Sequence, residues 1–277
     1  MYKIIVDSCG ELFEEMKNNA HFANVALTLE VGDYTILDDE NFNQAEFLQK
    51  VAEYEGSPKS ACPSPSAYME EMEDADNVYI ITLSAQLSGS YNSAVLAKNL
   101  FEEEEEDVNI HVFDSKSASI GQTLIAKRVA ELEEAGKSFE EVVEETESYI
   151  ATQHTFFVLE TLETLRKAGR LSNLKSMIAN TLNIKPVMGS TDIGSIQQLG
   201  QARGMKKALD KMADLMMAVT PDPENRVLAI SHCNCPETAE MLKERVEARA
   251  KFKEIIVVDT NGVSSMYAND GGVIMVV

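Results

Sequence analysis

Two hydroxyl-rich segments that we predict to be loops, residues 60–66 and 84–93, hold the side chains best suited to chemistry in this 277-residue chain. The second segment reads S-A-Q-L-S-G-S-Y-N-S and lies between a strand-like apolar run and a helical pattern. Backbone N–H groups at a helix start carry partial positive charge, Ser88 and Ser90 add hydroxyl donors, and Gly89 allows close approach. These features predict a site for a small anion such as a carboxylate or phosphate.

Helix capping and serine hydrolysis are the two alternative interpretations of the second segment. In the first, Ser88 or Ser90 only caps the following helix. In the second, Ser88 is a nucleophile, but the elbow G-x-S-x-G requires glycine where this chain has Gln86. A triad also needs a histidine, and only His232 of the four is expected at a strand end. The pattern disfavours a hydrolase and leaves capping open.

Metal and nucleotide chemistry have little support in the sequence. The run His232-Cys233-Asn234-Cys235 has metal-ligand residue types, but structural zinc usually takes two spaced pairs and no second pair exists. We expect a turn at a strand end there. The chain also lacks the G-x-x-x-x-G-K-[ST] loop and the G-x-G-x-x-G fingerprint that hold nucleotide phosphates. We therefore expect no metal, no cofactor and no nucleotide bound by this chain alone.

The net charge of −22 argues against nucleic acid and anionic membranes as partners, because an acidic surface repels phosphates. A basic cluster nevertheless lies in the second half, and it fits either a partner or phosphoryl group, or scattered surface salt bridges. Its members are Arg166, Lys167, Arg170, Lys185, Arg203, Lys206 and Lys207.

The cellular location is predicted from what the sequence does not contain. No apolar run approaches the length of a membrane span, and the first residues lead directly into a strand without the pattern of a signal peptide. The spacing of the four cysteines does not suggest a disulfide framework. We expect a cytoplasmic protein with reduced thiols.

Strand-like and helical segments alternate in the first half, which predicts a parallel sheet with helices on both faces. The expected strands are 3–6, 26–31, 78–83 and 110–113; the expected helices begin at Glu11, cover 43–54 and 90–101, and include one ending at Glu134. Ser138 and Glu141 predict a capping box for a further helix.

A mixed α+β pattern follows, and we place the boundary at residue 152, giving domains 1–152 and 153–277. Expected strands are 155–159, 184–188, 195–200, 227–231, 255–259 and 273–277; expected helices are 162–167, 174–182, 206–218 and 237–250.

Several short motifs, taken in order, resemble the DegV family of bacterial fatty-acid-binding proteins. They are I-I-V-D-S-C-G (4–10), P-K-S-A-C-P-S-P (58–65), I-T-L-S-A-Q-L-S-G-S-Y-N-S-A (81–94), V-F-D-S-K-S-A-S-I-G-Q (112–122), F-V-L-E-T-L-E-T-L-R-K-A-G-R-L-S (157–172), N-I-K-P-V (183–187) and A-R-G-M-K-K-A-L (202–209). The resemblance implies an N-terminal doubly wound α/β/α domain with a mainly parallel sheet and a C-terminal α/β layer with a mixed sheet.

The resemblance also implies a function. A long-chain fatty acid such as palmitate or stearate would lie in an apolar tunnel with its carboxylate held by hydroxyls. The better-understood members do no chemistry themselves: they present the carboxylate to a separate ATP-dependent kinase, which forms an acyl-phosphate for phospholipid synthesis. The expected role is thus a lipid-binding carrier subunit and not an enzyme.

Site residues follow by position. Ser60 falls where the family usually has a carboxylate-binding threonine, Ser88 on its second hydroxyl ligand, and Gly89 supplies the neighbouring N–H. Arg170 and Arg203 fall on recurring arginines that we assign to the kinase-facing surface or to phosphoryl contact.

The C-terminal motif departs from the family pattern. The family usually has a histidine followed by G-P-G, whereas this chain has Tyr267-Ala268-Asn269-Asp270-Gly271. Tyr267 still donates a hydrogen bond and is a possible third carboxylate contact, but it supplies no positive charge. Asp270 adds a negative charge. These departures motivate the alternative function of a regulatory paralogue that binds a lipid or small carboxylate without passing it to a kinase.

Overall fold

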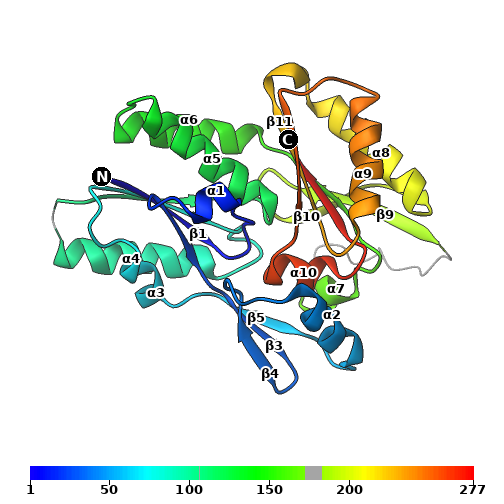
Figure 1. Ribbon diagram of the computed structural model, residues 1–277, viewed down its shortest axis with the longest axis horizontal. Coiled ribbons are helices and arrows are strands. Elements are labelled where there is room, and N and C mark those ends of the chain that lie inside the picture. Colours follow the sequence, from blue (N-terminus) through cyan, green and yellow to red (C-terminus); the bar gives the residue numbers. More distant parts are fainter. Residues whose placement is uncertain (106, 172–182) are drawn as a thin grey trace.

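The computed structural model describes residues 1–105, 107–171 and 183–277, and the strands within them form three sheets (Figure 1). Sheet A, of order β2-β1-β6-β7, is parallel throughout. Sheet C, of order β10-β9-β8-β13-β11-β12, is mixed: only β11 and β12 run parallel. Sheet B is a small antiparallel sheet of order β4-β3-β5.

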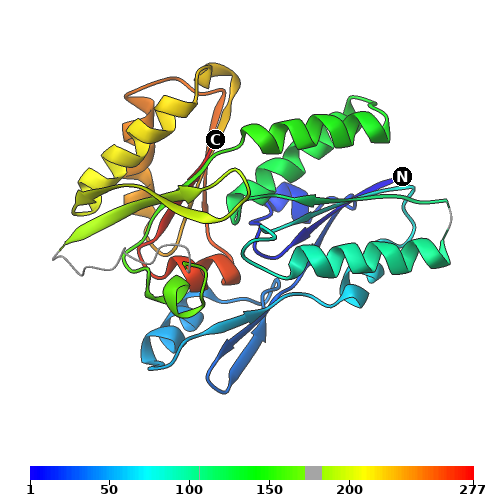
Figure 2. The same cartoon turned by 180° about the vertical axis from the view of Figure 1, so that it is seen from behind.

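Sheet A has helices on both faces because its apolar strands present side chains alternately to each side. Ile4 and Val6 pack toward the side of α5 and α6, whereas Ile5 packs toward α3 and α4 (Figures 1 and 2). The elements of this layer are β1 (Tyr2–Asp7), α1 (Glu14–Lys17), β2 (Phe22–Val25), α3 (Pro65–Glu70), β6 (Asn77–Thr82), α4 (Ser90–Glu104), β7 (Asn109–Asp114), α5 (Ile120–Glu134) and α6 (Phe139–Thr152).

Sheet C is covered on one face by α8 and α9, whose apolar stripes include Leu209, Met212 and Leu242 (Figure 2). Its other face is turned toward the first half of the chain. The elements are β8 (Thr155–Val158), β9 (Ile184–Ser190), β10 (Ile196–Arg203), α8 (Met205–Val219), the 3₁₀ turn η1 (Pro223–Asn225), β11 (Val227–His232), α9 (Pro236–Glu247), β12 (Glu254–Asp259) and β13 (Val273–Val276).

Sheet B lies below the junction of the two larger sheets in Figure 1, beside three short helices. It contains β3 (Thr28–Val31), β4 (Tyr34–Leu37) and β5 (Lys59–Ala61), and the helices are α2 (Gln44–Glu53), α7 (Glu163–Lys167) and α10 (Gly262–Ala268). No helix in the described part of the chain is long and apolar enough to cross a membrane.

The predicted α/β fold is confirmed, and the capping box of Ser138 and Glu141 is present at the start of α6. Several element predictions were wrong. The strand expected at 26–31 is present as β3, but the neighbouring strands β2 and β4 were not expected, and β2 belongs to a different sheet. The helix expected from Glu11 begins only at Glu14 and is the single turn α1, while Glu11 is buried and accepts a hydrogen bond from Ser119.

Strand β5 and helices α3 and α10 were not expected from the sequence. Ser60 therefore lies on a strand and not in a loop. The helix predicted at 174–182 lies outside the described residues. The domain boundary at residue 152 stays a prediction; it falls at the last residue of α6.

Candidate ligand-binding site

A cavity at the junction of the three sheets brings together most of the predicted site residues. It encloses about 860 Å³ of space between its lining atoms, the opening to solvent included. Ser60, Ser88, Arg170 and Tyr267 all line it.

The walls of the cavity are mainly apolar and come from all parts of the fold. Sheet C contributes Phe157 and Ile274, the first half contributes Leu83 and Leu87, and α10 contributes Val263. Further apolar lining residues are Leu27, Ala118, Leu159, Leu165, Ile196 and Ala268. A mainly apolar cavity that also presents hydroxyl and cationic side chains suits a ligand with a hydrocarbon chain and one polar head.

The topology of sheet A explains the position of this cavity. All four strands of the sheet run parallel, and a lining residue follows the carboxyl end of each: Cys9 after β1, Leu27 after β2, Leu83 after β6 and Lys116 after β7. Open α/β sheets bind ligands at this edge, where the strand order reverses. In sheet A the reversal lies between β1 and β6.

A hydrogen bond joins Ser60 to Tyr267 across 207 residues of sequence: their hydroxyl oxygens are 3.1 Å apart. Ser60 is on β5 and Tyr267 is on α10, and both side chains are half-buried. Each hydroxyl can donate one hydrogen bond and also accept. A carboxylate at this point could therefore take a hydrogen bond from one hydroxyl while the two remain in contact.

Ser88 lies at the start of α4. Its hydroxyl oxygen accepts from the N–H of Ser90 at 3.2 Å and is 3.1 Å from the Ser90 hydroxyl. The N-cap residue of α4 is Gly89, which has no capping side chain. Ser88 therefore caps one N–H at the helix start, that of Ser90. The N–H of Gly89 has no acceptor among the described residues.

Arg170 supports the same loop. Its Nε donates to the carbonyl of Leu87 at 3.0 Å, and its guanidinium also donates to the carbonyl of Ala168. Arg170 is half-buried and lines both the apolar cavity and a neighbouring polar hollow, which also includes Ser88 and Gly89. We call the part of the cavity around Ser60, Ser88, Arg170 and Tyr267 its mouth. The arginine therefore places a positive charge where an anionic head group would lie.

Asp7 of β1 holds Leu83, the residue directly before the Ser88 segment. Its fully buried carboxylate accepts from the N–H of Leu83 at 2.8 Å, from Gln122 Nε2 at 2.8 Å and from the N–H of Cys9 at 3.2 Å. Burial raises the pKa of Asp7 to about 6, although these hydrogen bonds favour the charged form. This bridge fixes the end of β6 against the end of β1, at the point where the strand order reverses.

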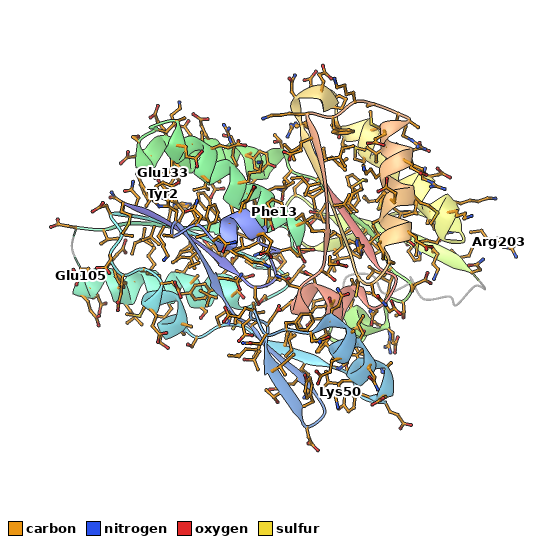
Figure 3. All side chains as sticks on the ribbon, in the orientation of Figure 1. Tyr2, Phe13, Lys50, Glu105, Glu133 and Arg203 are labelled. Carbon is orange, nitrogen blue, oxygen red and sulfur yellow. The ribbon has the colours of Figure 1, made fainter. Side chains whose placement is uncertain are left out.

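Arg203 and most of the basic cluster lie apart from the cavity. Arg203 is exposed at the end of β10, at the outer edge of the molecule (Figure 3). The salt-bridge interpretation is correct for Arg166, which pairs with Glu163, and for Lys185, which pairs with Glu160.

The hydrolase alternative gains no support from the site. None of the four histidines is among the described lining residues of the cavity, and Nδ1 of His232 is 3.2 Å from Asp259 Oδ1. Cys233 and Cys235 donate to the carbonyls of Ser265 and Gly272 in a turn after β11. Within the described residues, no group of three or more potential ligand side chains could hold a metal ion.

Sequence reasoning missed several residues that build the site. Asp7 gave a usable signal, because it is a charged residue directly after the buried run of β1. Lys116 and Ser119 line the cavity with left-handed backbone φ values of 51° and 58°, and no pattern indicates this. Ser119 hydrogen bonds to buried Glu11, whose pKa burial raises to about 7.

Comparison with known proteins places the chain in a family. A family model described as "Uncharacterised protein, DegV family" matches residues 1–276. A DegV domain-containing protein of Streptococcus pneumoniae is 34% identical over 277 residues, covering 99% of this chain and 98% of that protein. The chain therefore belongs to the DegV family.

Solved structures of similar proteins contain fatty acids. A DegV family protein from Ruminococcus gnavus ATCC 29149, refined with vaccenic acid, is 54% identical with a TM-score of 0.97, covering 100% of this chain and 99% of that chain. The Streptococcus pneumoniae fatty acid kinase (Fak) B3 protein, loaded with linoleic acid, is 33% identical with a TM-score of 0.91, covering 100% and 98%. A Eubacterium eligens DegV family protein was loaded with heptadecanoic acid; it is 26% identical with a TM-score of 0.91, covering 100% and 99%.

Proposed function

We propose that this chain binds a long-chain fatty acid in the apolar cavity, with the carboxylate at Ser60, Ser88 and the N–H of Gly89. The observation that carries the proposal is the presence of both serines at one apolar cavity. The fatty acids in the structures of relatives support the ligand class. We expect palmitate, stearate or an unsaturated chain such as vaccenic acid.

Tyr267 is the third proposed carboxylate contact. Its hydroxyl is in hydrogen-bond contact with the hydroxyl of Ser60. Tyr267 would therefore stabilise the Ser60 side of a carboxylate that lies between Ser60 and Ser88. Asp270, whose negative charge would oppose a carboxylate, accepts from Asn234 Nδ2 at 3.0 Å and is exposed. It is not among the described residues that line the cavity.

Denaturing extraction followed by mass spectrometry tests the ligand class. Protein purified from a bacterial host should release long-chain fatty acid in near-stoichiometric amount. Protein that carries none, and that also fails to bind added vaccenic or stearic acid, would rule the proposal out.

The proposed role is a non-catalytic carrier that presents the carboxylate to a separate ATP-dependent kinase. The sequence contains neither the G-x-x-x-x-G-K-[ST] loop nor the G-x-G-x-x-G fingerprint, and one relative is a fatty acid kinase (Fak) B3 protein. Arg170 at the mouth would contact the phosphoryl group. Arg203 and the exposed Lys206 and Lys207 would face the kinase.

The alternative function is a regulatory paralogue that binds lipid without a hand-off, motivated by tyrosine at position 267. Reconstitution with the cognate kinase and ATP decides between the two. Rapid formation of acyl-phosphate favours the carrier, and Arg203→Ala should then lower turnover without changing fatty acid affinity. Full lipid binding with no turnover would favour the paralogue.

A further inference from the structure

A buried carboxylate outside the cavity contacts the helix that carries Tyr267. Asp38 follows β4 and is 2% exposed. It accepts hydrogen bonds from the N–H of Gly262 at 2.7 Å and of Val263 at 2.8 Å, and from the Ser8 hydroxyl at 3.0 Å. A buried charge is stable only when it has such donors. Asp38 thus fixes the first turn of α10.

Sheet B fixes both partners of the Ser60–Tyr267 hydrogen bond. Leu29 of β3 pairs with Ser60 of β5 on one side and with Ile36 of β4 on the other. Asp38 is the first residue after β4. One side of the sheet therefore supports Ser60 directly, and the other side supports Tyr267 through Asp38 and α10.

The contact between sheet B and α10 has no spare room. A Cβ atom at position 262 would be 2.6 Å from Asp38 Oδ1 and 2.6 Å from Leu29 Cδ1, so only glycine fits. Helix α2 also contacts α10, since Nε2 of Gln44 donates to the carbonyl of Thr260 at 3.0 Å and to the hydroxyl of Ser265 at 3.2 Å. At the other end of α10, Asn269 accepts from the Thr164 hydroxyl at 2.9 Å.

We propose that Asp38 is a positioning residue for the carboxylate-binding mouth. By holding α10 against sheet B, it keeps the Tyr267 hydroxyl within hydrogen-bond reach of Ser60, and so sets affinity for the carboxylate head and not for the hydrocarbon chain. The inference rests on the proposed function in one respect: the cavity must bind a fatty acid carboxylate through Ser60 and Tyr267.

The test compares a long-chain fatty acid with the alcohol of the same chain length, which has no carboxylate. Asp38→Asn should weaken fatty acid binding about tenfold and alcohol binding less than about twofold, since one of the head-group contacts is displaced. Asp39→Asn is the matched control: the side chain of this neighbouring aspartate accepts only from the N–H of Asn41 among the described contacts. It should change neither affinity.

A double-mutant cycle separates positioning from general support of the fold. In a Tyr267→Phe background, Asp38→Asn should have little further effect on fatty acid affinity, because the hydroxyl that it positions is gone. Equal losses for acid and alcohol, or a full effect of Asp38→Asn in that background, would overturn the inference.

A milder variant covers the case in which Asp38→Asn does not fold. Ser8→Ala removes one of the three donors to Asp38 and should shift the acid-to-alcohol affinity ratio in the same direction by about two- to threefold. An unchanged ratio in this folded variant would count against the inference. Wild-type protein that does not bind fatty acid would instead contradict the proposed function.

Discussion

The two sides of the cavity mouth are built in different ways. The contacts of Ser88 itself are local: its hydroxyl contacts Ser90, and its N–H donates to the carbonyl of Ser84. The Ser60 side is long-range, since Tyr267 is 207 residues away and the Asp38–Gly262 contact spans 224. We infer that the first side is set by a strand–loop–helix unit and the second by the packing of sheet B on α10.

Removal of both hydroxyls should produce the largest effect. Ser60→Ala combined with Ser88→Ala should weaken fatty acid binding by about 2–4 kcal/mol, because a carboxylate loses a charge-assisted hydrogen bond on each side. Calorimetric titration of each single variant and of the pair would measure this. If the two sides are independent, the two losses should add.

The control for this experiment is Ser64→Ala. Ser64 caps α3 through the N–H of Ala67 and does not line the cavity in the described residues. It should lose about 1 kcal/mol of stability and no affinity. Fatty acid affinity that is unchanged in the double variant would contradict the placement of the head group.

A smaller effect concerns how stability depends on pH, because a buried carboxylate supports each side of the mouth: Asp7 on the Ser88 side and Asp38 on the Ser60 side. Burial raises the pKa of both Asp7 and Asp38 to about 6, so the folded protein holds these protons more tightly than the unfolded chain does. Their contribution to stability is present below the unfolded pKa near 4 and is lost as pH rises through about 6.

The free energy of unfolding of the wild type should therefore fall between about pH 4 and pH 7. In Asp7→Asn this fall should be smaller by about 1–3 kcal/mol. Chemical denaturation across that interval, for wild type and variant, measures the difference. Glu15→Asn at an exposed position serves as the control. Parallel profiles for wild type and Asp7→Asn would show that the Asp7 carboxylate does not titrate there.

The smallest expected effect is that of Tyr267→Phe, which removes one hydroxyl and keeps the ring. It should weaken fatty acid binding by about 0.5–1.5 kcal/mol and should be non-additive with Ser60→Ala, because the two hydroxyls are in contact. It should be additive with Ser88→Ala. The reverse pattern of coupling would show that the division of the mouth into two sides is wrong.

The same contrast explains how much the sequence could predict. The strand before Ser84 and the helix after Gly89 follow from apolar periodicity, and both are present. The four-residue β4, the three-residue β5 and the seven-residue α10 are too short for periodicity to identify. The positions of Ser60 and Tyr267 came only from family resemblance, and Asp38 gave no signal because its contacts are distant in sequence.

We propose above all that a fatty acid carboxylate lies between Ser60 and Ser88, with the hydrocarbon chain in the apolar cavity. A crystal structure of the protein loaded with vaccenic acid tests this most directly. We predict carboxylate oxygens within hydrogen-bond distance of both serine hydroxyls and of the Gly89 N–H. A carboxylate elsewhere in the cavity, such as beside Lys116, would contradict this placement. So would a fatty acid that is bound outside the cavity.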